Sequence, residues 1–176
     1  KNIEIFIGSQ TDLQFLKKIK NKIPKVDILI DDGGHFMNQQ IISFNELFGH
    51  IKDDGVYLCE DTHTSYWLSF GGGYKRRGTF LEYSKNFIDQ LNAFHSEQKE
   101  LRPNQFTSSV DSIHYYDSVV VIQKKKRNPP KNLISGELSF GKSKISNFSP
   151  KLKPSQKNRL LIVLNKIIRR FRIGNF

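Results

Sequence analysis

Ile28-Leu-Ile-Asp-Asp-Gly-Gly-His35 is a short apolar run followed directly by two carboxylates, two glycines and a histidine. Val56-Tyr-Leu-Cys-Glu-Asp61 follows the same pattern further along, because each stretch is a short apolar run that ends abruptly in carboxylates. Such runs are typical of buried parallel strands that deliver charged groups to the carboxyl edge of a sheet. One helix-length segment separates the two stretches, so we expect neighbouring strands whose carboxyl ends meet.

Four carboxylates and one histidine would then lie together at that edge: Asp31, Asp32, Glu60, Asp61 and His35. Carboxylates at short range repel one another unless a cation or shared protons relieve the repulsion. A divalent metal on oxygen ligands is the simplest relief, and a histidine beside it suggests proton transfer. The alternative is that these carboxylates only complete turns and cap helices, as Asp after a strand often does. We take the metal and proton-transfer site as the hypothesis.

Apolar periodicity around these stretches predicts an α/β fold. The expected elements are a strand at 3–7, a helix at 13–22 capped by Thr11 or Asp12, a strand at 26–30, a helix at 38–51, a turn at 52–55 and a strand at 56–59. This alternation predicts a parallel sheet with right-handed crossovers. Further along we expect a loop at 62–78, a helix at 79–97 and an antiparallel strand pair at 110–116 and 118–123.

Charge divides the chain into a globular part and a basic tail. We expect a domain at 1–127, a linker at 128–154 and a basic amphipathic helix at 155–176. Residues 1–123 carry 13 basic and 16 acidic side chains, whereas ten Lys and Arg residues and no acidic residue lie from Lys142 to Arg172. The net charge of +11 therefore comes from the residues after 123 and does not indicate nucleic-acid binding by the globular part.

The tail has three candidate partners. A basic amphipathic helix can lie on an anionic membrane surface, bind a groove of a partner, or contact nucleic acid. Nucleic acid ranks last, because the tail has few aromatic side chains that could stack on bases. The single cysteine, Cys59, excludes an internal disulfide and favours a reducing compartment. We expect a cytoplasmic protein, with 155–172 as the contact to the inner face of the membrane, and leave a second copy of the chain open as a partner.

Four motifs along the chain resemble those of a known protein family. They are Ile30-Asp-Asp-Gly-Gly-His35, Gly55-Val-Tyr-Leu-Cys-Glu-Asp-Thr-His-Thr-Ser-Tyr-Trp67, Phe70-Gly-Gly-Gly-Tyr74 and Ser112-Ile-His-Tyr-Tyr-Asp-Ser-Val-Val-Val-Ile122. They resemble the class I S-adenosylmethionine-dependent O-methyltransferases, and more narrowly the metal-dependent sugar methyltransferases of the mycinamicin and macrocin type. The resemblance implies a Rossmann-like sheet of strand order 3-2-1-4-5-7-6. In that order 3–7 would be strand 3, and strands 1 and 2 would precede residue 1, so we expect a fragment that alone binds cosubstrate poorly.

The resemblance also implies the roles of individual residues. Mg²⁺, with Mn²⁺ as a substitute, would be held by Asp32, Glu60 and Asp61, and the general base would be His35. The cosubstrate S-adenosylmethionine would be contacted by Gly8, Ser9, Gln10 and Asp31. Ser9 departs from the family, which usually has Asp at that place in the loop beneath the adenine.

The segment 62–78 is expected to form a mobile lid over the acceptor. Its Gly71-Gly-Gly73 run lacks the Gly-Lys-Ser/Thr ending of a phosphate loop, which excludes a nucleoside triphosphate site of that kind. The residues that we assign to the acceptor are His63, Tyr66, Trp67 and Tyr74. Hydrophobic packing stays open as the alternative for the three aromatic residues, and a hydrogen bond to a backbone carbonyl stays open for His63.

Together these features predict a metal-dependent O-methyltransferase that acts on a hydroxyl of a sugar or glycan. The alternative is a non-catalytic remnant or interaction module that retains the carboxylates and histidine at the strand ends.

Overall fold

The computed structural model describes residues 3–133, 135 and 136. The predicted basic helix at 155–176 and the predicted linker from residue 137 onward lie outside the described residues. Within the described residues, no helix is both long enough and apolar enough to cross a membrane.

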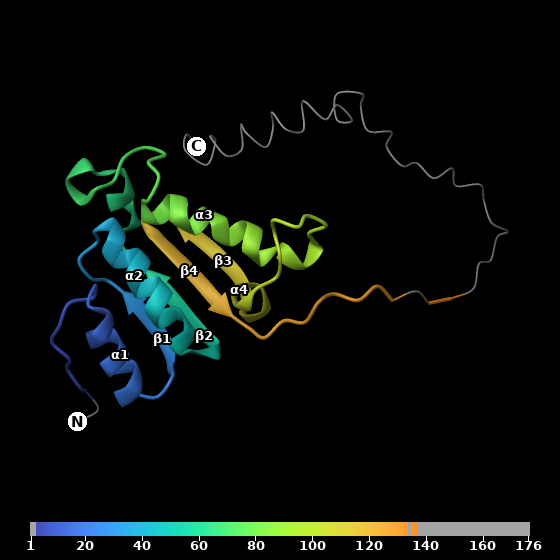
Figure 1. Ribbon diagram of the computed structural model, residues 1–176, viewed down its shortest axis with the longest axis horizontal. Coiled ribbons are helices and arrows are strands. Elements are labelled where there is room, and N and C mark those ends of the chain that lie inside the picture. Colours follow the sequence, from blue (N-terminus) through green and yellow to red (C-terminus); the bar gives the residue numbers. More distant parts are fainter. Residues whose placement is uncertain (1–2, 134, 137–176) are drawn as a thin grey trace. The chain divides into compact units, whose positions relative to one another are not determined.

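Four strands form one sheet in the order β1-β2-β4-β3 (Figure 1). Their bounds are Val26–Asp31 for β1, Ile51–Cys59 for β2, Val110–Tyr116 for β3 and Val119–Lys124 for β4. β1 and β2 run parallel, whereas β4 is antiparallel to both β2 and β3. The predicted parallel pair and the predicted antiparallel pair are both confirmed.

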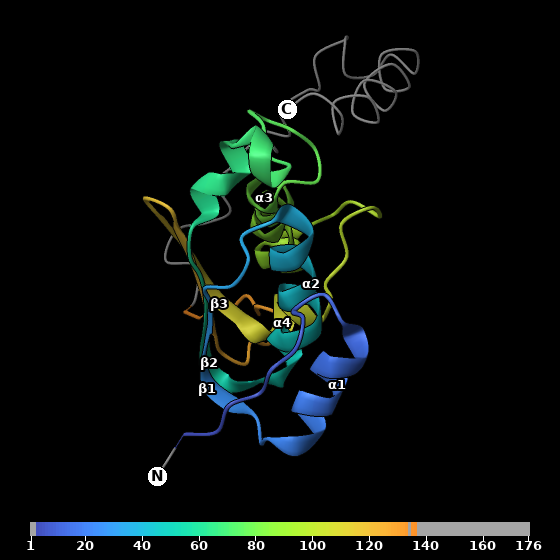
Figure 2. The ribbon, with the colours of Figure 1, turned by 90° about the vertical axis from the view of Figure 1, so that its left-hand side faces the viewer.

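Four α-helices lie on one face of this sheet (Figure 2). They are α1 at Leu13–Lys22, α2 at Met37–Leu47, α3 at Phe80–Leu91 and α4 at Gln105–Ser109. Side chains alternate along each strand, so those that face the helices are buried, including Tyr57 in β2 and Ile122 in β4. On the other face, Ile28 and Ile30 of β1 remain 63% and 59% exposed. The described helices therefore cover one side of the sheet.

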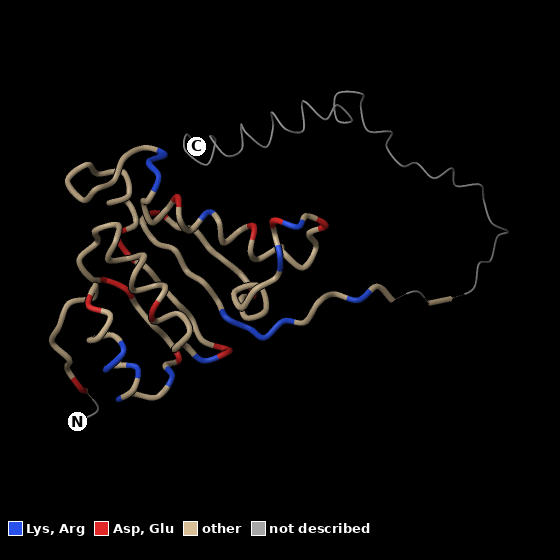
Figure 3. Tube along the Cα trace, in the orientation of Figure 1, with Lys and Arg blue, Asp and Glu red and all other residues tan. Residues whose placement is uncertain are grey.

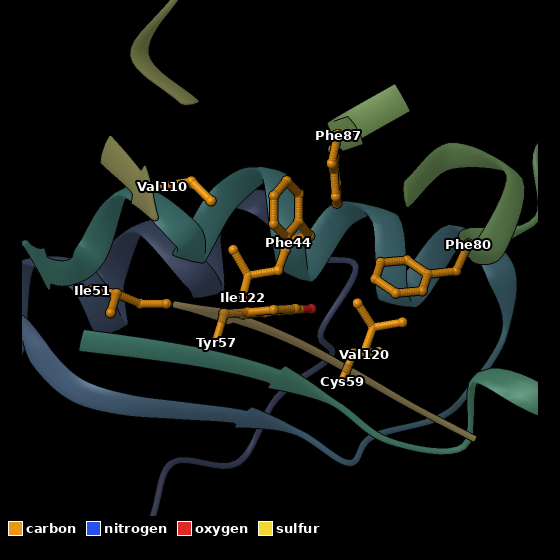
Figure 4. Packing of buried hydrophobic residues seen from close by; sticks show 9 residues of the cluster. All are labelled: Phe44, Ile51, Tyr57, Cys59, Phe80, Phe87, Val110, Val120 and Ile122. Carbon is orange, nitrogen blue, oxygen red and sulfur yellow. The ribbon is translucent and has the colours of Figure 1, made fainter. Parts of the chain in front are cut away.

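Aromatic rings fill the space between α2, α3 and the sheet (Figure 4). Phe44 of α2 stacks on Phe87 of α3 with ring centroids 4.6 Å apart, and meets the ring of Tyr57 edge-on at 5.2 Å. Cys59 lies in the same cluster, where burial raises the pKa of its thiol. This cysteine is therefore a core residue rather than a reactive thiol, as its place in a predicted strand indicated.

A run of basic residues, Lys124 to Arg127, begins at the last residue of β4 (Figure 3). The Lys124 ammonium is buried and donates a hydrogen bond of 2.7 Å to the carbonyl of Ile51, and burial lowers its pKa. The Arg127 guanidinium donates to the carbonyls of Leu91 and Val110. These two cations bind the end of β4 and the residues after it to neighbouring elements. They are therefore part of the globular structure and not only an exposed basic segment.

The predicted strand at 3–7 is wrong. These residues form no strand, and the alternating side chains of Ile3, Ile5 and Ile7 are 83%, 79% and 93% exposed. A strand needs a neighbour to accept its backbone hydrogen bonds, and in the described part of the chain β1 pairs with β2 alone. The alternating isoleucines of 3–7 are thus typical of a strand, but the described residues contain no strand that pairs with this segment.

The boundaries of other elements also differ from the prediction. β2 begins at Ile51 and includes the predicted turn at 52–55 as an irregularity, because Val26 pairs with Ile51 while Ile28 pairs with Val56. Gly55 is needed there, since a Cβ would lie 2.5 Å from the carbonyl oxygen of Asp27. Four short 3₁₀ segments at 48–50, 62–66, 68–70 and 93–95 and the helix α4 were not predicted, and α3 ends at Leu91 rather than near 97.

Candidate metal and proton-transfer site

The parallel pairing of β1 and β2 brings the two predicted carboxylate stretches together. Asp31 is opposite Cys59 in the register, and the backbone N–H of Glu60 donates to the carbonyl of Asp31 at 3.0 Å. Both strands thus end side by side, and the residues that follow them meet at the carboxyl edge of the sheet. Asp32 continues from one strand, and Asp61 continues from the other.

Asp32, His35 and Asp61 form a compact group at this edge. One ligand atom from each lies within 4.8 Å of the others. His35 Nε2 is 3.5 Å from Asp61 Oδ2 and 3.9 Å from Asp32 Oδ1. The two carboxylate side chains are about half exposed, at 59% and 46%, whereas the histidine side chain is 22% exposed. The carboxylates are therefore accessible to a cation from the solvent, whereas the imidazole is largely enclosed by the protein.

The backbone of this group is strained at two of its three residues. His35 has φ 58° and Asp61 has φ 52°, which is the left-handed region that residues with a Cβ seldom adopt. Such conformations persist only where the surrounding structure enforces them, and they concentrate at functional sites. In the imidazole of His35, Nε2 faces the carboxylates, and Nδ1 is buried with no hydrogen-bond partner among the described residues.

Glu60, which was predicted as a third metal ligand, is not a member of this group. Its backbone lies beside the group, because its N–H donates to Asp31 and its carbonyl accepts from Gln40 Nε2 at 3.2 Å. The structure thus brings together two of the three predicted carboxylate ligands with the predicted base. Glu60 as a ligand stays a prediction.

Asp31 and Gln10, both predicted to contact the cosubstrate, bond to each other. Gln10 Nε2 donates to Asp31 Oδ1 at 3.1 Å, and the hydroxyl of Tyr57 donates to Asp31 Oδ2 at 3.1 Å. Burial raises the pKa of the Asp31 carboxyl, and these two hydrogen bonds oppose that rise. The contact of Tyr57 with Asp31 could not be predicted from the sequence, because its hydroxyl reaches Asp31 only through strand pairing.

Gln10 also joins its own loop to the turn after β1. Its Nε2 donates to Ser43 Oγ at 2.9 Å, and its Oε1 accepts from the N–H of Gly34 at 2.7 Å. A Cβ at Gly33 would lie 2.3 Å from that Oε1, so the Gly-Gly pair makes room for this contact. Gly8 and Ser9, the other residues predicted for the cosubstrate, are exposed in the turn that leads into α1.

Of the residues predicted for the acceptor, His63 lies beside the group and Trp67 contacts His63. His63 Nδ1 is 3.9 Å from Asp61 Oδ1 and hydrogen-bonds with the hydroxyl of Ser118. The indole of Trp67 meets the His63 ring edge-on at 4.6 Å and remains half exposed. Tyr66 and Tyr74 are 54% and 79% exposed, so their rings are available to a ligand and are not consumed by core packing.

Known proteins that resemble this chain are sugar O-methyltransferases. The chain is 34% identical over 128 residues to the mycinamicin VI 2''-O-methyltransferase of Micromonospora griseorubida, which covers 69% of this chain and 31% of that protein. It is 32% identical over 130 residues to the demethylmacrocin O-methyltransferase of Streptomyces fradiae, covering 70% and 32%. The chain thus spans about a third of the length of the curated relatives that it matches. No family model matches it.

The solved structures lead to the same enzymes. The MycE methyltransferase from the mycinamycin biosynthetic pathway, in complex with Mg and SAH, matches with a TM-score of 0.66 at 32% identity. The match covers 70% of this chain and 33% of that one. This chain is a homologue of the mycinamicin- and macrocin-type O-methyltransferases. The sheet of this O-methyltransferase homologue is partial relative to MycE, and its order β1-β2-β4-β3 is the order expected for strands 4-5-7-6.

Proposed function

We propose that this chain contributes the metal and proton-transfer site of an S-adenosylmethionine-dependent O-methyltransferase that acts on a sugar hydroxyl. The observation that carries the proposal is the group of Asp32, His35 and Asp61 at the carboxyl edge of the sheet. It occurs in a homologue of enzymes that methylate sugars, and the matching MycE structures hold Mg and SAH. The relatives' names support a sugar attached to a larger natural product as the acceptor.

The residues of the group suit a hard divalent cation. Carboxylate oxygens are the ligands that Mg²⁺ prefers, and Mn²⁺ accepts them as well. We assign Asp32 and Asp61 as ligands, with Glu60 as the third. When bound, the cation would act as a Lewis acid that lowers the pKa of the acceptor hydroxyl.

The protein's own side chains would do the remaining work. His35 Nε2 faces the carboxylates and would accept the proton of the hydroxyl, and Asp61 at 3.5 Å would stabilise the imidazolium that forms. Trp67, His63, Tyr66 and Tyr74 would contact the acceptor. The cosubstrate would lie on the side of Gly8, Ser9, Gln10 and Asp31, where alignment of the hydroxyl with the sulfonium methyl supplies much of the acceleration.

The decisive experiment measures metal binding and methyl transfer in the full-length gene product. Asp61→Asn and Asp32→Asn should each weaken Mg²⁺ binding by about tenfold or more, because each removes a charged ligand. His35→Gln should leave most of the Mg²⁺ affinity but lower kcat by about 10²- to 10⁴-fold, the usual effect of losing a general base. Isothermal titration and transfer of labelled methyl to a glycosylated macrolide measure the two effects.

Asp27→Asn is the matched control. Asp27 lies at the opposite end of β1 from the group and forms an exposed ion pair with Lys52. Asp27→Asn should therefore change neither the Mg²⁺ affinity nor kcat. Unchanged Mg²⁺ affinity in both carboxylate variants would contradict the metal site. Metal binding without methyl transfer in the full-length protein would favour the alternative, a non-catalytic interaction module.

We also propose where the protein acts. A cytoplasmic location agrees with the reduced cysteine. A contact of residues 155–172 with an anionic membrane surface is supported by the six Lys and Arg residues of this stretch, which has no acidic residue. A second copy of the chain stays a candidate partner.

A further inference from the structure

Thr64 links the turn after β1 to the segment after β2. It lies in the 3₁₀ segment Thr62–Tyr66, and its side chain is buried, with 2% exposed. Its hydroxyl is 2.8 Å from the carbonyl oxygen of Asp61 and 3.0 Å from the carbonyl oxygen of His35. The backbone N–H of Thr64 donates to the same Asp61 carbonyl at 3.1 Å.

The two carbonyls that accept from Thr64 belong to the two strained residues of the group. His35 and Asp61 both have left-handed backbones, and each provides a side chain that the proposed reaction needs. A hydroxyl has one proton, so Thr64 shares it between two acceptors in a three-centre bond. The Thr64 hydroxyl thus connects the backbones of two strained residues, His35 at a separation of 29 positions and Asp61 at a separation of three. Within the described residues it provides the one hydrogen bond between Thr64 and His35, whereas the Asp61 carbonyl also accepts from the Thr64 backbone N–H.

We propose that Thr64 is a positioning residue that sets the distance between the His35 imidazole and the Asp61 carboxylate. This inference rests on the proposed function, because it assigns His35 and Asp61 the roles of base and metal ligand. The Thr64 hydroxyl bonds to backbone carbonyls and is not a member of the ligand group, so it acts through the other two residues. A misplacement of about 1 Å at a reacting group can lower the rate by about 10²-fold.

The conservative variants separate positioning from packing. Thr64→Val keeps the shape of the side chain but removes the proton that both carbonyls accept. Thr64→Ser keeps the hydroxyl and removes only the methyl group. Thr62→Val is the matched control, since Thr62 is equally buried in the same segment and its backbone N–H, which donates to Ser118 at 3.0 Å, survives the change.

The experiment uses the full-length protein and two readouts. In Thr64→Val, kcat should fall by about 10- to 100-fold while KM for S-adenosylmethionine stays within about threefold, because the defect lies in alignment rather than cosubstrate binding. Binding of Mn²⁺ without cosubstrate, followed by electron paramagnetic resonance, should weaken by about threefold or more, because Asp61 shifts. Thr64→Ser should restore both values to near those of the wild type, and Thr62→Val should leave them unchanged.

Each outcome decides the inference. If the wild type neither binds Mn²⁺ nor transfers methyl, the proposed function fails, and this inference fails with it. If the wild type does both and Thr64→Val matches it, only the positioning role is overturned. Thr64→Ala removes the same hydroxyl with less bulk and replaces Thr64→Val if that variant does not fold. If neither folds, the hydroxyl is a requirement of the fold, and the positioning role is also overturned.

Discussion

At the scale of single residues, the strand-end pattern predicted which side chains would meet but not how they are held. Asp32, His35 and Asp61 could be predicted to gather, because parallel strands bring their carboxyl ends to one edge. The contacts of Thr64 and Tyr57 could not, because each depends on the exact approach of segments more than 20 positions apart. In the sequence, Tyr57 looks like any other strand residue and Thr64 like any other loop residue, so neither pattern indicates a hydrogen bond of its hydroxyl to the site.

The pKa of Asp31 leads to a prediction about stability. Burial raises its pKa in the folded protein above the ordinary value of 3.8, so folding favours the protonated carboxyl. Its contribution to stability is therefore full below about pH 3.8 and is lost as the pH rises through the raised pKa of the folded state. Asp31→Asn stays neutral, so its free energy of unfolding relative to wild type should increase as the pH rises from about 4 to 7.

Urea unfolding at several pH values measures this difference. Asn can keep the bond from Gln10 through its amide oxygen, and the hydroxyl of Tyr57 can turn to accept from the amide nitrogen. Asp27→Asn provides the control, because its carboxylate is 76% exposed and its pairing with Lys52 occurs in solvent. A pH trend of the same size in both variants would mean that burial of Asp31 is not its cause.

At the scale of elements, the periodicity of apolar residues predicted most helices and strands, but it could not predict whether a strand finds a partner to pair with. Helices α1, α2 and α3 and all four strands agree with the predicted apolar patterns, with differences at their ends. The segment 3–7 has the alternation of a strand and forms none, because no local signal indicates whether a neighbouring strand is present. The five-residue helix α4 is too short for a period to reveal it.

The start of α1 offers a test at this scale. Asp12 caps the helix, because its carboxylate accepts from the backbone N–H groups of Gln14 and Phe15. Asp12→Ala should lower the free energy of unfolding by about 0.5–2 kcal/mol, whereas Asp12→Asn should lose only a small part of this, since Asn also caps well. Thermal and urea unfolding monitored by circular dichroism would show the difference. Equal losses in both variants would indicate that the charge, rather than the cap, stabilises the helix.

At the scale of the whole molecule, the excess of positive charge lies after residue 123 in the sequence, whereas Asp32, His35 and Asp61 belong to the part before it, which carries 13 basic and 16 acidic side chains. Within the described residues, Lys124 and Arg127 are already bonded to backbone carbonyls of the globular part. The ten basic residues from 142 to 172 have no acidic neighbours in the sequence. An anionic membrane surface is the partner that we propose for this stretch, because its basic residues would be attracted to the lipid head groups and its apolar residues suit the interface of a bilayer.

Vesicle binding of the full-length protein tests this partner. Changing Lys157, Lys166, Arg169, Arg170 and Arg172 to Gln should weaken co-sedimentation with vesicles that contain phosphatidylserine by more than about a hundredfold, since each basic residue near such a surface contributes about 1 kcal/mol. Binding by the unchanged protein should also decrease as salt rises from 0.05 to 0.5 M, because these charges would be screened, and should be weak on neutral vesicles. The substitutions leave every apolar residue in place, so a loss confined to charged vesicles would assign the attraction to charge. If the unchanged protein pellets equally with and without vesicles, the membrane contact is excluded. Vesicle binding that resists both salt and the substitutions would instead assign the contact to the apolar residues of the tail.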